Sequence, residues 1–117
     1  MSTVLLVAVV ADEHEEAAVA IAREEGAQGV TVLPGRGISF PEHITFFGLT
    51  YRGLEKVLLW TLDAETAETI AQRLNRELDL LQPFQGLAFC ITLDHADGVD
   101  PQQIRDHITA QRTQPHR

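Results

Sequence analysis

The sequence lacks features that disulfide-stabilised proteins, nucleic-acid-binding proteins and membrane-spanning proteins require. Its 117 residues include one cysteine, Cys90, so no disulfide can form within the chain, and a reducing, cytoplasmic setting is expected. Nine lysine and arginine residues stand against seventeen aspartate and glutamate residues, and the net charge of −8 disfavours binding to nucleic acid or an anionic membrane. The apolar run at residues 3–10 is too short to insert across a bilayer and lacks the basic leader of a signal peptide.

Signatures of catalysis and metal binding are also missing. The sequence contains no nucleophile elbow, Walker-type phosphate loop or zinc-protease motif, so the chain is not expected to be an enzyme. The five histidines form no compact ligand pair. Asp94, His95 and Asp97 are close in sequence, but neighbouring side chains on a turn diverge, so no metal site is predicted there.

The apolar pattern of the first third predicts a strand, a helix and a second strand. Residues 3–10 are aliphatic on both faces, which is typical of a central strand. Residues 11–25 form the predicted helix, with Asp12 as its N-cap and Gly26 as its stop. Residues 28–33 form the second predicted strand.

Breaker residues decide the prediction for the middle of the chain. Pro34, together with the glycines that follow it, predicts the end of the second strand and a loop through residue 42. Residues 44–62 are predicted to form a hairpin with its turn at residues 52–54.

The last third is predicted to contain the clearest helix and the final strand. Residues 63–80 carry a one-sided apolar stripe, and Asp63 is the predicted N-cap. Residues 87–93 form the predicted last core strand.

The predicted order of strand, helix, strand, strand, helix, strand is that of a ferredoxin-like α+β sandwich, βαββαβ. This fold has an antiparallel sheet with two helices on one face and the first and third core strands at its centre. Residues 1–99 are predicted to form this single domain. Residues 100–117 are predicted to be a polar C-terminal extension that is partly helical or disordered.

The two central strands also predict self-association. Both faces of residues 3–10 and 55–62 are apolar, but the helices can cover only one face. Soluble monomers rarely expose a large apolar surface, so the other face is predicted to be buried in a homo-oligomer. The alternative is a C-terminal segment that covers the face in cis, although this segment offers only Ile104 and Ile108.

Several short motifs resemble those of PII nitrogen regulatory proteins, and their order and spacing cover about residues 3–99. Gly35-Arg36-Gly37 stands where that family begins its long T-loop. Residues 26–32 (GAQGVTV) resemble the family's helix-to-strand corner. The other similarities are to a divergent subgroup that accompanies membrane transport proteins. Residues 47–50 and 55–59 resemble the hairpin of this subgroup, and residues 86–89 and 93–99 resemble its final strand and exit turn.

The resemblance implies a cytoplasmic, ferredoxin-like homotrimer that acts in signal transduction. A small effector, either an adenine nucleotide or an anion, would bind in clefts between subunits, and the T-loop would then control a partner protein such as a membrane transporter. This sequence departs from the family in two places. Residues 34–44 make a short T-loop, and residues 81–86 retain only Gly86 of a phosphate-binding loop rich in glycine and lysine.

The effector site is predicted from glycines, whose backbone amides can approach an anion, and from side chains able to bind one. These residues are Thr31, Gly35, Arg36, Gly37, Gln85 and Gly86. The alternative is that they form plain turns with Arg36 solvated. Contacts with a partner are predicted at Phe40 and Pro41, because an exposed aromatic residue at a polar loop tip can be a docking contact, and the alternative is that it folds back onto the sheet. Arg52 could reach an anion or a partner, and the alternative is that it is solvated, as an arginine in a hairpin turn commonly is.

Two other functions are compatible with the sequence. One is a metal-binding trimer of related ferredoxin-like fold that uses histidines and carboxylates. The other is a small enzyme built on the same sheet, which ranks last because the sequence contains no convergent acid–base pair.

Overall fold

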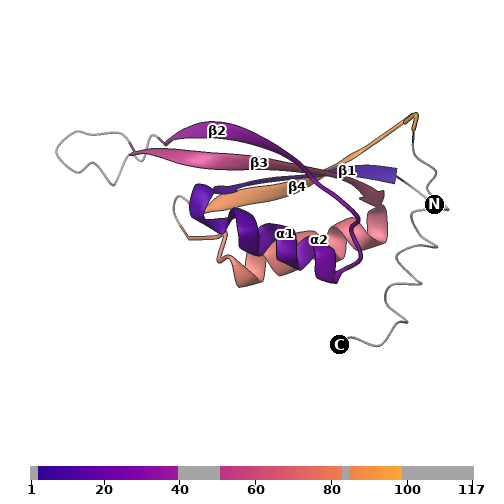
Figure 1. Ribbon diagram of the computed structural model, residues 1–117, viewed down its shortest axis with the longest axis horizontal. Coiled ribbons are helices and arrows are strands. Elements are labelled where there is room, and N and C mark those ends of the chain that lie inside the picture. Colours follow the sequence, from indigo (N-terminus) through magenta and orange to yellow (C-terminus); the bar gives the residue numbers. More distant parts are fainter. Residues whose placement is uncertain (1–2, 40–50, 83–84, 99–117) are drawn as a thin grey trace.

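The computed structural model describes residues 3–39, 51–82 and 85–98. These residues form one four-stranded antiparallel sheet with the strand order β2-β3-β1-β4, and both α-helices pack on the same face of it (Figure 1). This architecture confirms the predicted ferredoxin-like α+β fold. The elements, in chain order, are β1 (Thr3–Ala11), the 3₁₀ turn η1 (Asp12–His14), α1 (Glu15–Glu24), β2 (Thr31–Ser39), β3 (Tyr51–Asp63), α2 (Ala64–Glu77) and β4 (Gly86–Thr92).

β1 and β3 are the central strands, as predicted. β1 pairs with β3 from Thr3↔Asp63 to Ala11↔Glu55, and on its other side with β4. A central strand of an antiparallel sheet needs an apolar side chain only at every second residue if its other face meets water, whereas a strand covered on both faces is apolar throughout. The aliphatic sequence of β1 follows the second pattern.

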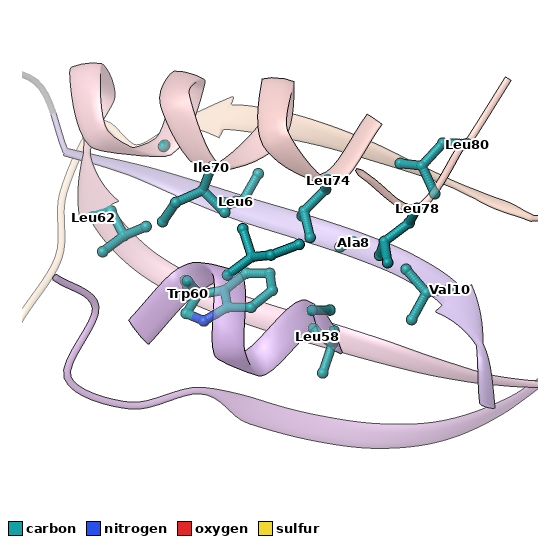
Figure 2. Close-up of a cluster of buried hydrophobic side chains, with 14 of the residues drawn as sticks. Leu6, Ala8, Val10, Leu58, Trp60, Leu62, Ile70, Leu74, Leu78 and Leu80 are labelled. Atoms are coloured by element: carbon teal, nitrogen blue, oxygen red, sulfur yellow. The ribbon is translucent and has the colours of Figure 1, made fainter. Parts of the chain in front are cut away.

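The core lies between the sheet and the helices (Figure 2). α2 begins where Asp63 caps it, since the backbone N–H of Thr66 donates to Asp63 Oδ2 at 3.2 Å, which confirms the predicted N-cap. Its apolar stripe then packs on alternate residues of the central strands. The buried set includes Val4, Leu6, Ala8 and Val10 of β1, Leu58, Trp60 and Leu62 of β3, and Ile70 and Leu74 of α2.

The start of α1 differs from the prediction. Residues 12–14 form a 3₁₀ turn, the α-helix begins at Glu15, and no side chain caps it. Asp12 was therefore wrongly assigned as the N-cap, and its carboxylate instead lies 3.3 Å from Lys56 Nζ. The predicted stop is confirmed, because Gly26 has a φ of 104° in the left-handed region.

The predicted break at Pro34 is wrong. β2 continues to Ser39 and pairs with β3 through Pro34↔Lys56 to Ser39↔Tyr51. Proline is tolerated because β2 is an edge strand, where a missing N–H donor can face away from the sheet. The turn predicted at residues 52–54 is also wrong, since these residues lie within β3, and Gly53 pairs with Gly37.

β2 and β3 extend past the rest of the sheet as a two-stranded arm. The last β1 partner of β3 is Glu55, so the pairs from Arg36↔Leu54 to Ser39↔Tyr51 have no third strand beside them. We call residues 36–39 and 51–54 the arm. Figure 1 shows it projecting beyond both helices. Among the described residues, no helix is long and apolar enough to cross a membrane.

Candidate functional site

The predicted effector residues lie on opposite edges of the sheet. Pro34 pairs with Lys56, Lys56 with Val10, and Val10 with Gly86, so one row of residues runs from β2 to β4 at one end of the sheet. Three strand spacings of about 4.8 Å separate the two ends of this row, a distance of about 14 Å. One copy of the chain therefore does not bring Arg36 and Gly86 together.

On the β2 edge, the arginine is available to a ligand. Arg36 is exposed, and it makes no ion pair with any residue that the structure describes. Beside it the carboxylate of Glu55 lies against Gly37, at a place where a side-chain Cβ would collide with it. Thr31 pairs with Leu59, four residues along β2 from Gly35, so it lies about 13 Å away and outside this cluster.

On the β4 edge, Gln85 and Gly86 are held by the η1 turn and by β1. His14 Nε2 lies 3.0 Å from Gln85 Oε1 and makes a hydrogen bond that ties η1 to the entry of β4. Gly86 has a φ of +132°, and a Cβ at this position would collide with the carbonyl oxygen of Val9. The entry to β4 therefore depends on glycine, as expected for a backbone that must approach another closely.

Lys56 is a site residue that the sequence prediction missed. It is the only lysine in the chain, and it occupies the middle of the row that links the two edges. Its Nζ lies 3.3 Å from Asp12 Oδ1 and 3.4 Å from Glu15 Oε1. Hydrogen bonds from Asp12 and then Glu15 raise the pKa of Lys56 above its ordinary value. A lone lysine within an apolar strand was the signal that would have identified it.

Arg36 and Lys56 share one face of the sheet. Pro34 is directly opposite Lys56, so Arg36 is its diagonal neighbour at about 7 Å between Cα atoms. Two cationic side chains therefore emerge side by side where the arm leaves the sheet. Lys56 is already paired with Asp12 and Glu15, so Arg36 is the cation that is open to an anionic group.

The Lys56 ion pairs predict a pH dependence of stability. Because the folded-state pKa of Lys56 is raised above 10.5, these pairs stabilise the fold fully below about pH 10.5, and their contribution is lost as the pH rises through the raised pKa. Lys56→Met should therefore show a smaller loss of stability between about pH 9 and pH 12 than the parent protein. Urea unfolding midpoints across this range measure the difference.

Lys56→Arg is the matched control, because arginine stays charged throughout the range and should retain the ion pairs. Equal alkaline slopes for the parent and Lys56→Met would show that the two carboxylates do not stabilise Lys56.

The predicted partner contacts are only partly placed. Phe40 and Pro41 lie outside the described residues. Arg52 lies in the arm as part of β3, not in a turn.

His95 Nε2 and Asp97 Oδ1 are 3.0 Å apart on the exposed segment after β4. Within residues 3–39, 51–82 and 85–98, no group of three or more histidine, cysteine or acidic side chains is placed to hold a metal ion.

Comparison of the sequence with family models and with curated proteins gives no match.

Comparison of the structure with solved structures gives clear matches. A putative PII-like signalling protein from Thermus thermophilus superposes with a TM-score of 0.59 and 24% identity, covering 80% of this chain and 90% of that one. A nitrogen regulatory PII-like protein from Thiomonas intermedia, solved with ADP, AMP and bicarbonate, gives 0.62 at 11% identity, covering 85% and 98%. The periplasmic divalent cation tolerance protein CutA from Archaeoglobus fulgidus gives 0.66 at 10% identity, covering 91% and 98%. The chain thus has the ferredoxin-like fold common to PII-like and CutA proteins.

Proposed function

We propose that the chain is a PII-like signalling regulator whose effector site forms only where two copies meet. The observation that carries this proposal is the row from Pro34 to Gly86, which sets the two halves of the site at the same end of the sheet but on opposite edges. A second copy placed against either edge completes the site.

The strand directions support a cyclic assembly. Every pairing in the sheet is antiparallel, so β2 and β4 run in opposite directions. When copies are related by rotation about an axis parallel to the strands, the β2 edge of one copy meets the β4 edge of the next in an antiparallel sense. The same rotation keeps Pro34 of one copy level with Gly86 of its neighbour, and Arg36 lies two residues, about 7 Å, further along β2. We infer a homotrimer, which is also what the resemblance to PII proteins implies.

The open face of the sheet supplies the driving force for assembly. Two rows of side chains cross all four strands on this face: Leu33, Val57, Val9 and Leu87, and beside them Thr31, Leu59, Val7 and Phe89. In the single chain Leu33 is 46% exposed, Leu87 51% and Phe89 43%. Complete burial of such a side chain is worth about 1.5–3 kcal/mol, so burying the exposed half is worth roughly half of that, and soluble monomers rarely leave a face of this kind uncovered.

The chemistry of the site favours an anionic effector. Arg36 offers a bidentate guanidinium with no ion-pair partner among the described residues, and Gly86 of the adjacent copy carries no side chain of its own. We take an adenine nucleotide or bicarbonate as the effector, since the PII-like neighbour from Thiomonas intermedia carries ADP, AMP and bicarbonate. The segment 81–86 provides no lysine for a nucleotide phosphate, so Arg36 takes that role in this proposal.

Signalling then requires the effector to favour one conformation of the arm over another. The arm begins at Arg36, so a ligand held by this side chain acts directly on its base. The regulated partner is a cytoplasmic or membrane-bound protein, and a transporter fits the resemblance to the PII-like subgroup.

Thermal-shift measurements with ATP, ADP, AMP and bicarbonate test the proposal. Arg36→Ala should abolish the stabilisation that the parent protein gains from the active ligand, because a ligand present well below its dissociation constant does not stabilise the folded state. Arg76→Ala is the matched control, since Arg76 is 73% exposed on α2 and its variant should keep the full shift. A shift that survives Arg36→Ala would place the site elsewhere.

A metal-binding function is the second candidate. CutA structures superpose with TM-scores as high as the PII-like ones, so the fold alone fits both functions. Titration calorimetry with copper or zinc, run beside the nucleotide screen, separates the two. Metal binding at micromolar affinity with no response to nucleotide or bicarbonate would replace our proposal.

A further inference from the structure

A pocket of about 110 Å³ lies on the helix side of the sheet, between α1 and the segment that joins α1 to β2. It contains none of the predicted effector residues and none of the side chains that form the two rows on the open face. The lining includes Val19, Ala22 and Arg23 of α1, Ala27 and Gln28 after it, and Trp60 of β3.

The pocket exists because β2 begins late along β3. The first pair of the two strands is Thr31↔Leu59, so Trp60 and the end of β3 have no β2 partner beside them. The joining segment covers this part with small residues. A Cβ built on Gly29 would meet no atom within 4 Å, and Ala27 carries only a methyl group. One side of the Trp60 ring is therefore left open to the pocket.

The indole N–H of Trp60 is a donor without an acceptor at the wall of this pocket. Trp60 is only 3% exposed, and its N–H makes no hydrogen bond with any residue that the structure describes. Its nitrogen is not among the fully enclosed polar atoms, so it is reachable from the pocket. Figure 2 shows this nitrogen on the α1 side of the ring. A buried indole N–H usually has a hydrogen-bond acceptor.

Arg23 adds an unpaired positive charge to the same pocket. It is exposed in the last turn of α1 and makes no ion pair with a described residue. The glutamates that follow it are held elsewhere, since Glu24 Oε2 and Glu25 Oε2 lie 2.8 and 2.9 Å from Arg73. Among the described residues, which exclude the predicted C-terminal extension at 100–117, no carboxylate lines the pocket.

The end of α1 is compatible with an anion beside it. The last carbonyl groups of a helix carry partial negative charge, which would repel an anion. Here the N–H of Gly26 donates to the carbonyl of Arg23, and the N–H of Ala27 donates to the carbonyl of Ala22, both at 3.0 Å. These carbonyls are already hydrogen-bonded, and the guanidinium of Arg23 adds a full positive charge.

We propose that this pocket binds a short-chain monocarboxylate such as propionate. The guanidinium of Arg23 matches the geometry of a carboxylate, and the indole N–H of Trp60 donates to one of its oxygens. The apolar walls, including Val19 and Ala22, contact the alkyl tail. A water molecule takes up about 30 Å³ of liquid, so the pocket admits an acid of about two to four carbons but no nucleotide. The inference is independent of the proposed effector site.

Trp60 reports binding directly, because it is the only tryptophan in the chain and gives a single indole cross-peak in a ¹H–¹⁵N correlation spectrum. Titration with propionate at neutral pH should move this cross-peak to a higher proton shift and then saturate, since the N–H donates to a carboxylate oxygen. A ligand with about five non-hydrogen atoms binds at best with a low micromolar dissociation constant, so the titration extends to about 20 mM. A cross-peak that stays in place would overturn the proposal.

Two matched comparisons assign the contacts. Arg23→Gln should weaken propionate binding at least about tenfold, because a charged hydrogen-bond donor is lost. Arg36→Gln makes the same change at the proposed effector site and should keep the parental affinity. Propionamide has the shape of propionate without its charge, so it should bind at least about tenfold more weakly. Equal affinities for Arg23→Gln and the parent, equal affinities for amide and acid, or a loss of binding in Arg36→Gln would overturn the proposal.

A third ligand distinguishes a free acid from a carboxylate carried by a protein. N-acetylaspartate N-methylamide presents the same carboxylate on a peptide backbone, and its two amide groups exceed the space of the pocket. It should therefore bind more weakly than propionate. Tighter binding of this compound would overturn the assignment to a free acid, and it would indicate that an acidic side chain of a partner protein occupies the pocket.

Discussion

Substituting Gly86 with alanine is expected to lower the free energy of unfolding by about 2–6 kcal/mol, the combined range for strain at a disfavoured φ and for overpacking. Gly86 has a φ of +132°, which side chains rarely adopt, and the new Cβ would collide with the carbonyl oxygen of Val9. This obstacle is backbone in the central strand β1, so it cannot rotate away as a flexible side chain would. Urea unfolding monitored through Trp60 measures the loss.

Gly29→Ala is the matched control for this substitution. No atom lies within 4 Å of a Cβ built on Gly29, so the added methyl group meets open space. We expect its free energy of unfolding to stay within about 0.5 kcal/mol of the parent value, as for most surface substitutions. If Gly86→Ala proves equally mild, β4 does not enter the sheet with the backbone described above.

Phe89→Glu should convert the assembled protein into monomers that remain folded. Phe89 lies opposite Val7 on the edge strand β4, where the open face reaches the edge that each copy would present to its neighbour. A carboxylate buried in this apolar contact without a partner is strongly unfavourable. In the isolated chain Phe89 is 43% exposed, so the fold of a single copy should lose little. Sedimentation velocity at micromolar concentration reports the mass, and circular dichroism reports the fold.

The same variant also tests whether the effector site is shared between copies. A monomer separates Arg36 from the Gly86 of any neighbour, so Phe89→Glu should lose the thermal shift with nucleotide or bicarbonate. Arg76→Glu is the control, since Arg76 is 73% exposed on α2, on the other side of the sheet from the open face. A parent chain that sediments as a monomer, or a Phe89→Glu variant that stays assembled, would contradict the proposed assembly.

The sequence predicted well those elements whose signals are local. The apolar stripe of α2, its N-cap Asp63 and the aliphatic sequence of β1 each indicate the local structure through residues that are close together in the chain. β2 was predicted poorly because Pro34 and two glycines locally favour a break. Pairing with β3 along nine residues outweighed that preference, and the edge position of β2 removed the penalty for proline. A single sequence does not reveal which strand lies at an edge.

The candidate site was predicted in its residues but not in its geometry. Arg36 and Gly86 were identified from glycine and charge chemistry, yet their placement on opposite edges follows from the strand order, which long-range pairing determines. The role of Lys56 depends on Asp12 and Glu15, which reach it from another element. Such a contact leaves no spacing pattern in the sequence.

The arm of residues 36–39 and 51–54 has a mechanical consequence. Paired strands resist bending along their length, so we expect the two strands of the arm to rotate as one unit. The pivot is the point where the third strand ends, at the pair Ala11↔Glu55. Four residue steps give it a reach of about 13 Å, so a swing of about 10° at the pivot displaces its far end by about 2 Å. An anion bound at Arg36 would act close to this pivot, where a small displacement produces the largest movement of the far end of the arm.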